Sequence, residues 1–469
     1  MRFGVSILAT SLLLSNFATA STVSVELVLA TGQPVPGIAD STIQRFGNFG
    51  VINDAGVTAY APVYATPDGG TEQGVLMVGD TVIARTGDPA PNLPGLTLGS
   101  VNLKAINNSG QAVYTAALKG PGVTNTNFLA HFGPEGLIAR MGDVAPDTGG
   151  GRYRSFFGTA DIDDAGTIVF HANLEGGNVS FNAPALFSKS SGESTELVLR
   201  TGQTAPDGAV YNFISPYFSL TKAGKLAFIG QLPTGGSVTP ANNFGIFTLD
   251  GPILRNGDAI PDFANDISIV DAHMNESGNV AIIGNFKDGS TNSQGIFTDK
   301  GVIALRGDKA PGTEGAGEGI NFLSFAVTNT VIGDAGDVVF GAFMTGPGGV
   351  GNFIDRFRGT SLFWASPDGT IYDLMLSGTM IDFGGGDVRR VKESRMRSSG
   401  ISTWGVSFLT NFEDGSQALF RARSPWETVA TPPVTTLPHG VIPLPAAGWL
   451  LLGGIGIFAG LARRRRVGA

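Results

Sequence analysis

The chain has 469 residues, of which 69 are glycine, 15% are charged and none is cysteine. Abundant glycine without a collagen period is typical of short strands joined by turns, and the lack of thiols excludes disulfides, cysteine nucleophiles and thiolate metal ligands. The formal net charge of −9 argues against nucleic acid as a partner, because an acidic body repels phosphate.

The first twenty residues have the pattern of a secretory signal peptide. Arg2 gives a positive start, an apolar run extends from Val5 to Leu14, and Ala18 and Ala20 supply the small residues of a cleavage site. Signal peptidase recognises charge, apolar run and small residues in this order. We therefore expect cleavage after Ala20 and export; the alternative is a buried N-terminal strand.

The body, residues 21–425, repeats a short Gly-Asp/Gln-x-x-Pro motif with a period of about 55 residues. A fixed period of this length is typical of repeat architectures in which one supersecondary unit recurs. The motif follows an apolar stretch in each copy, and the seventh copy is degenerate. Its glycines are Gly32, Gly87, Gly142, Gly202, Gly257, Gly307 and Gly378.

A second motif, Asn/Asp-x-x-Gly, alternates with the first and leads into alternating apolar residues. An Asn or Asp side chain caps a tight turn, glycine takes the positive φ that other residues resist, and the alternation predicts a half-buried strand. Weaker copies begin at Thr221, Gly333 and Ser402. The clearest copies run from Asn53 to Gly56, Asn107 to Gly110, Asp163 to Gly166 and Asn275 to Gly278.

A third apolar motif, such as Ala185-Leu186-Phe187, brings each unit to about four strands. Seven four-stranded units predict an all-β fold, a seven-bladed β-propeller, with a β-solenoid as the alternative. The segments Val23 to Pro36 and Gly405 to Arg423 are complementary half-units. We expect Val25 to Leu29 to pair with Ala418 to Ala422 and close the ring.

After a Pro/Thr-rich linker at 426–440, residues 441–469 form a C-terminal signal. An apolar run from Ala446 to Ala462 precedes four arginines. As a helix it would be about 26 Å long, enough to cross a bilayer core, with the arginines on the cytoplasmic side. The short motif and the arginine cluster are Ile442, Pro443, Leu444, Pro445, Ala446 and Arg463, Arg464, Arg465, Arg466.

This tail resembles the VPLPA-CTERM sorting signals of Gram-negative bacteria, which are related to PEP-CTERM signals, with Ile442 in place of the usual Val. The resemblance implies an exosortase-type processing enzyme, membrane tethering in the periplasm and later display at the cell surface. The alternative is a tail anchor that is never cut. The repeats resemble the NxxGxxAF, choice-of-anchor families of exported proteins, best at 53–60 and 275–282, which imply a surface location and no settled activity.

The sequence shows no catalytic constellation. His131, His171, His273 and His439 occupy different phases of the repeat. Oxygens for Ca²⁺ could come from Asp161, Asp163, Asp164, Asp334 and Asp337, but turn capping is the favoured explanation, because these residues fall at the turn position of the repeat,. Arg306-Gly307-Asp308 spells an adhesion tripeptide but is the sixth copy of the Gly-Asp motif. We expect no cofactor other than this possible Ca²⁺.

These features favour a non-catalytic exported module that binds exopolysaccharide or another surface partner. Its binding surface is expected on the insertions at Asn178–Pro184, Gly312–Gly319 and Gly346–Asp355. The alternative is a propeller-type glycan hydrolase or lyase, with Asp, Glu, His and Tyr side chains converging on the central channel.

The tail hypothesis predicts that deletion of Ile442–Ala469 releases the body as soluble protein, because the motif, the apolar helix and the positive stop are removed together. Fractionation of cells followed by immunoblotting measures this. The control is the intact mass of the wild-type protein isolated from cells. If the mature protein with all four arginines is the sole species found, the sorting hypothesis is wrong and the tail is a simple membrane anchor.

Overall fold

The computed structural model of the protein describes residues 23–66, 72–205, 208–313, 320–345, 359–397 and 400–424. All of them belong to the first of two compact units, which extends to Trp426. The expected signal peptide, linker, sorting motif, apolar helix and arginine cluster lie outside the described residues. Among the described residues, none belongs to a helix with the length and hydropathy needed to span a bilayer.

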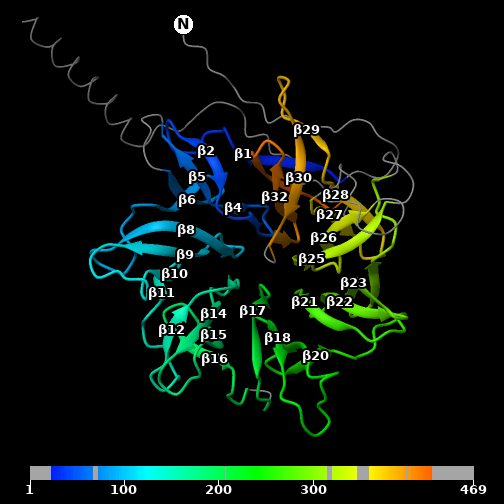
Figure 1. Cartoon of the computed structure of the whole chain (residues 1–469). Helices are drawn as coiled ribbons and strands as arrows, with labels where there is room; N and C mark the ends of the chain where they lie inside the picture. The colour runs from blue at the N-terminus through cyan, green and yellow to red at the C-terminus, as the bar shows by residue number, and fades with distance from the viewer. Residues whose placement is uncertain are drawn as a thin grey trace, which may run out of the picture. The chain divides into compact units, whose positions relative to one another are not determined.

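In the described part of the chain the strands form seven antiparallel sheets arranged around a common centre (Figure 1). Four of these sheets contain four strands in sequence order from the centre outward. Their strands are β8 (Thr97–Ile106), β9 (Ala112–Lys119), β10 (Leu129–Gly133), β11 (Gly136–Arg140); β17 (Phe213–Leu220), β18 (Leu226–Gln231), β19 (Phe244–Thr248), β20 (Gly251–Arg255); β21 (Ser268–Met274), β22 (Val280–Asp288), β23 (Thr291–Thr298), β24 (Gly301–Leu305); and β25 (Asn321–Ile332), β26 (Val338–Thr345), β27 (Ser361–Ala365), β28 (Ile371–Met375).

Two further sheets follow the same plan with interrupted strands. In both, short breaks divide the strands nearest the centre. Numbered in chain order, these are the first and third blades. The first blade contains β2 (Thr42–Phe46), β3 (Val51–Ile52), β4 (Thr58–Tyr60), β5 (Pro62–Ala65), β6 (Gln73–Val78) and β7 (Thr81–Arg85). The third contains β12 (Arg152–Ser155), β13 (Ala160–Ile162), β14 (Ile168–Glu175), β15 (Ala183–Lys189) and β16 (Glu196–Arg200).

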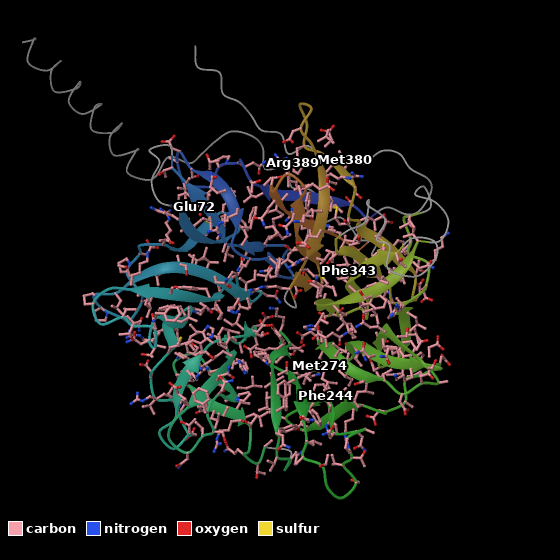
Figure 2. The ribbon with its side chains drawn as sticks, viewed as in Figure 1. Glu72, Phe244, Met274, Phe343, Met380 and Arg389 are labelled. Atoms are coloured by element: carbon pink, nitrogen blue, oxygen red, sulfur yellow. The ribbon has the colours of Figure 1, made fainter. Side chains whose placement is uncertain are left out.

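The seventh sheet is built from both ends of the chain. Its strands from the N-terminal and C-terminal segments are β1 (Val25–Ala30), β29 (Met380–Asp382), β30 (Val388–Arg395), β31 (Ile401–Ser402), β32 (Gly405–Phe412) and β33 (Gln417–Ala422). Strand β1 pairs antiparallel with β33, with Val25 opposite Ala422 and Ala30 opposite Ala418. The seven-bladed propeller and its closure by the terminal strands are therefore confirmed, and the solenoid is excluded. At the rim, the β29–β30 hairpin carries Met380 and Arg389 (Figure 2).

The aromatic residues of the repeat explain why each unit forms a blade. In five blades of the described structure, aromatic rings on the second and third strands lie directly opposite each other and stack. Cross-strand aromatic pairs each contribute about 0.5–1.5 kcal/mol beyond the area they bury. The ring centroids are 5.4–6.1 Å apart in the pairs Tyr114–Phe132, Phe170–Phe187, Phe228–Phe247, Phe340–Phe363 and Phe408–Phe420.

Removing residues 21–37 should destabilise the whole propeller by about 3 kcal/mol or more. The deletion takes away Val25, Leu27 and Leu29, which pack on the seventh blade, at about 1.5 kcal/mol each, and it leaves β33 as an unpaired edge. Urea unfolding gives the free energy of unfolding. Hydrogen exchange of β17 and β18, on the far side of the ring (Figure 1), reports whether the effect is global.

Glu26→Gln is the matched control in the same strand, because it removes one exposed ion pair, 2.9 Å to Arg421, whose contribution is at most about 1 kcal/mol. If β17 and β18 of the deletion variant remain fully protected from hydrogen exchange, the ring does not unfold as one cooperative unit and the prediction is wrong.

Candidate functional site

The seven Asn-x-x-Gly turns join the first and second strands of each blade at one end of the inner strands. In five of these turns, within the described structure, the side-chain oxygen of the first residue accepts a hydrogen bond from the backbone N–H four residues later. This cap closes the turn locally. The acceptors and distances are Asn53 2.9 Å, Asn107 2.9 Å, Asp163 2.7 Å, Thr221 3.0 Å and Asn275 2.9 Å.

The same asparagines also reach the next blade through their amide nitrogens. Asn53 Nδ2 donates to the carbonyl of Asn107 at 3.2 Å, and Asn107 Nδ2 donates to the carbonyl of Asp163 at 3.0 Å. Asn275 Nδ2 donates to the carbonyl of Gly333 at 2.8 Å. Asparagine carries an acceptor and a donor, so one side chain both caps its own turn and links two blades.

The second residue of each turn continues this connection around the axis. At six blade junctions in the described residues, its backbone N–H donates to the second residue of the following turn. Lys222 has no side-chain acceptor, and its backbone carbonyl takes the bond from Asp164 instead. The ring consists of Asp54, Asn108, Asp164, Lys222, Glu276, Asp334 and Thr403.

The Gly-Asp motif forms the other repeated link between blades. Each of its seven glycines donates its N–H, at 2.7–3.3 Å, to a carbonyl at the start of the next blade. The Asp carboxylate turns back onto its own strand, as when Asp88 accepts from Arg85 N–H at 2.7 Å. Asp308 does the same with Leu305 N–H at 2.7 Å. The Arg306-Gly307-Asp308 tripeptide thus has the structural role of its repeat position.

The carboxylates considered for Ca²⁺ are engaged in this framework. Asp163 caps its turn, and Asp164 and Asp334 accept bonds from neighbouring turns. Asp161 accepts from Ile162 N–H at 2.8 Å, and Asp337 accepts from Trp364 Nε1 at 2.7 Å. Within the described residues, no group of three His, Asp or Glu side chains is placed to hold a metal ion.

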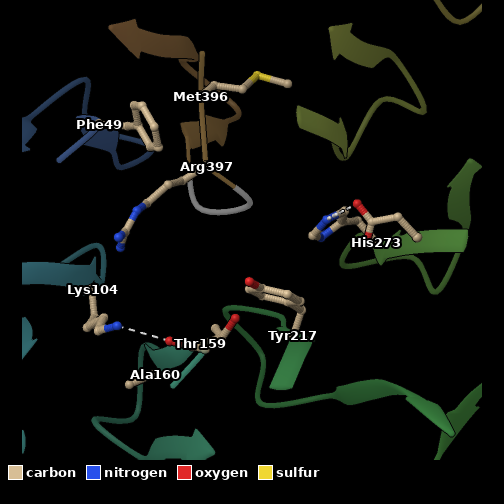
Figure 3. A pocket seen from close by; sticks show the side chains of 10 residues that line it. Phe49, Lys104, Thr159, Ala160, Tyr217, His273, Met396 and Arg397 are labelled. Carbon is tan, nitrogen blue, oxygen red and sulfur yellow. Dashed lines mark hydrogen bonds and ion pairs between the residues drawn. The ribbon is translucent and has the colours of Figure 1, made fainter. Parts of the chain in front are cut away.

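A cavity of about 230 Å³ lies on the axis, where the inner strands of several blades converge. Figure 3 shows Lys104 and Arg397 on one side of this cavity, with Tyr217 and His273 facing them. Phe49 also lines it. A smaller cavity of about 80 Å³ lies within the turn ring, where Asp54, Asp161, Lys222, Glu276 and Asp334 are among the lining residues.

Backbone carbonyls position the two cations of the larger cavity. Lys104 Nζ donates to Gly158 O at 3.0 Å, and Arg397 Nη1 donates to Leu103 O at 2.8 Å. Burial lowers the pKa of Lys104 to about 8, and repulsion from Arg397 adds to this effect. Burial also lowers the pKa of Arg397. Burial thus disfavours the charged form of both groups.

Acidic side chains lie near this cationic pair. Asp271 lines the cavity, and its carboxylate is 3.8 Å from Nε2 of His273. Burial raises the pKa of Asp161 to about 6, against the favourable fields of Lys222 and Arg397. Positive and negative charges therefore share the axis, with both Lys104 and Arg397 exposed to the cavity.

The histidines do not gather into a site. His273 lines the cavity, and its Nδ1 lies 3.4 Å from Ser219 Oγ. His131 and His171 are buried in adjacent blades, and burial lowers both pKa values, that of His171 to about 4. These two imidazoles are therefore neutral packing groups near pH 7. His439 lies outside the described residues.

Sequence reasoning missed Lys104, Tyr217, Asp271 and Arg397. They precede their turns by three to five residues, in segments that line the cavity but share no common residue. An alignment of the units by their turns would have placed these polar residues in the same short segment. The insertion at Asn178–Pro184 follows β14 and runs into the start of β15, and it does not line the cavity. Residues 314–319 and 346–358 lie outside the described residues.

The sequence matches the Family of unknown function (DUF7453) over residues 15–301 and again over 135–391. The chain belongs to this family. The two overlapping matches are what a repeated architecture produces when its units align in more than one register. No curated protein matches the sequence.

Several solved structures are similar to this chain at low identity. The β-propeller domain of the Trilobed protease from Pyrococcus furiosus has a TM-score of 0.41 and 11% identity, over 81% of this chain and 93% of that chain. The polysaccharide lyase Uly1 has a TM-score of 0.38 and 8% identity, over 85% and 92%. The Dos1 propeller has a TM-score of 0.34 and 9% identity, over 84% and 95%. Similarity at this level says nothing about the activity of this family member.

Two equivalent turn glycines should differ in their tolerance of a side chain. Gly56 has φ 76°, and an added Cβ would lie 2.5 Å from Trp404 Nε1; Gly278 has φ 85° and open space around it. Gly278→Ala should cost about 1 kcal/mol from backbone strain. Gly56→Ala should cost about 1–3 kcal/mol more from the clash. Thermal unfolding measures both, and equal losses would refute a role for Trp404 contact.

Proposed function

We propose that this protein is an exported, surface-associated binding module whose ligand occupies the central cavity. The observation that supports this most is the convergence of Lys104, Tyr217, His273 and Arg397 from different blades on one cavity. Pockets that combine aromatic surface with a few convergent polar groups are the usual small-ligand sites. A closed ring holds such side chains in place before binding, which lowers the entropic cost of recognition.

The location of the module is part of the same proposal. The signal-peptide pattern ending at Ala20 supports export, and the motif at 442–446 followed by Arg463–Arg466 supports processing by an exosortase-type enzyme. Cleavage between the propeller and the arginines would free the module from the membrane. An exopolysaccharide or another cell-surface polymer is then the partner within its reach.

Lyase chemistry is the second candidate, and the lowered pKa of Lys104, about 8, favours it. In a β-elimination a base removes the proton next to a sugar carboxylate. The neighbouring C–O bond then breaks, a carbon–carbon double bond forms and the leaving oxygen takes a proton. Neutral Lys104 or His273 would serve as base, Arg397 would stabilise the enolate charge, and Tyr217 would protonate the leaving group.

A glycan array combined with a pull-down of surface polymers tests the binding function. We expect the mature chain to retain a defined polymer and Tyr217→Ala to lose at least about tenfold in affinity, since this ring lines the cavity,. Phe181→Ala is the matched control: this ring is 73% exposed on the β14–β15 insertion. If Phe181→Ala weakens binding more than Tyr217→Ala, the binding surface lies on the insertion. If the chain retains no polymer at all, the proposal of a binding module is refuted.

The same samples separate binding from lyase activity. Ultraviolet absorbance from a newly formed double bond, lost in Lys104→Met, would establish elimination. Retained polymer of unchanged length and absorbance would leave the non-catalytic module.

A further inference from the structure

We infer that the central cavity is a recognition site for a carboxylate-bearing sugar, such as a uronate residue of an acidic polysaccharide, with the carboxylate held between Arg397 and Lys104. This inference rests on the proposed binding function and names its ligand class. Neither the sequence motifs nor the family description assigns this site.

The cations provide the first argument. Two side chains that repel each other are held at one cavity of a chain with net charge −9. Both side chains donate hydrogen bonds to backbone carbonyls, Lys104 to Gly158 O and Arg397 to Leu103 O. An anion between Arg397 and Lys104 would relieve their repulsion, and a guanidinium is suited to bind a carboxylate through paired hydrogen bonds.

The aromatic residues provide the second argument. Tyr217 lines the cavity and is 47% exposed, and Phe49 lines it from another blade. Exposed rings beside a polar cavity mark a contact surface. Sugar rings present apolar C–H faces together with hydroxyl groups, so a ring face and a phenol complement them.

Size provides the third argument. The cavity volume of about 230 Å³ is below the range of roughly 300–1,000 Å³ typical of drug-sized ligands. The site therefore suits one sugar unit or the end of a chain. Asp271 beside His273 gives the opposite wall hydrogen-bonding capacity for hydroxyls, and it would repel a carboxylate placed on that side. The carboxylate is thereby oriented toward Arg397 and Lys104.

Isothermal titration of the mature chain in mild detergent tests the inference with three probes: oligogalacturonate, the same oligosaccharide with its carboxyls reduced to alcohols, and inorganic phosphate. We expect the acidic oligosaccharide to bind and its reduced form to bind at least about tenfold more weakly. Arg397→Gln, Lys104→Met and Arg397→Lys should each weaken acidic binding, because a lysine cannot reproduce the paired geometry.

Arg154→Gln is the matched control and should leave affinity unchanged, because Arg154 stacks on exposed Phe181 at 4.5 Å and does not line the cavity. If Arg397→Gln lowers the melting temperature, Lys104→Met and Tyr217→Ala still decide the question. Equal binding of the acidic and reduced sugars, an equal loss in Arg154→Gln, or tight binding of phosphate alone would overturn the inference. Retention of a neutral polymer on the array would overturn it and leave the proposed module intact; no retention at all would refute both.

Discussion

The pairing of β1 with β33 is the contact on which the rest of the structure depends. It joins residues as distant as Glu26 and Arg421, 395 positions apart, and completes a sheet that neither terminus could form alone. Without β1, β33 would be an edge strand, and the ring would have a free end. Because each blade packs against two neighbours, closure allows the inner strands to hold a fixed geometry around the axis.

Each repeated motif stabilises its own turn and also links two neighbouring blades. Asn53 and Asn107 cap their own turns and also bind the carbonyl of the following turn. Asp163 and Thr221 keep the cap but lack the amide donor. These two copies therefore retain what the turn needs locally, and the backbone bond from Asp164 to Lys222 maintains the ring between these two blades.

Charge is unevenly distributed along the axis. The turn ring contains Asp54, Asp164, Glu276 and Asp334 with the single cation Lys222, whereas the larger cavity contains Lys104 and Arg397. Asp161 links the two regions electrostatically, since the fields of Lys222 and Arg397 both favour its ionised form. Fixed charges of opposite sign on one rigid axis orient a polar ligand more strongly than the net charge of the chain would suggest.

The sequence by itself determined the β class, the seven units, the turn positions and the closing pairing of Val25 to Leu29 with Ala418 to Ala422. These properties follow from local rules: glycine at positive φ, side-chain caps, period-2 alternation, and half-units that complement each other. Only the tertiary structure decided which side chains line the central cavity. Lys104, Tyr217, Asp271 and Arg397 line it from four different units and share no motif. Their meeting depends on the curvature of the whole ring, which no single unit encodes.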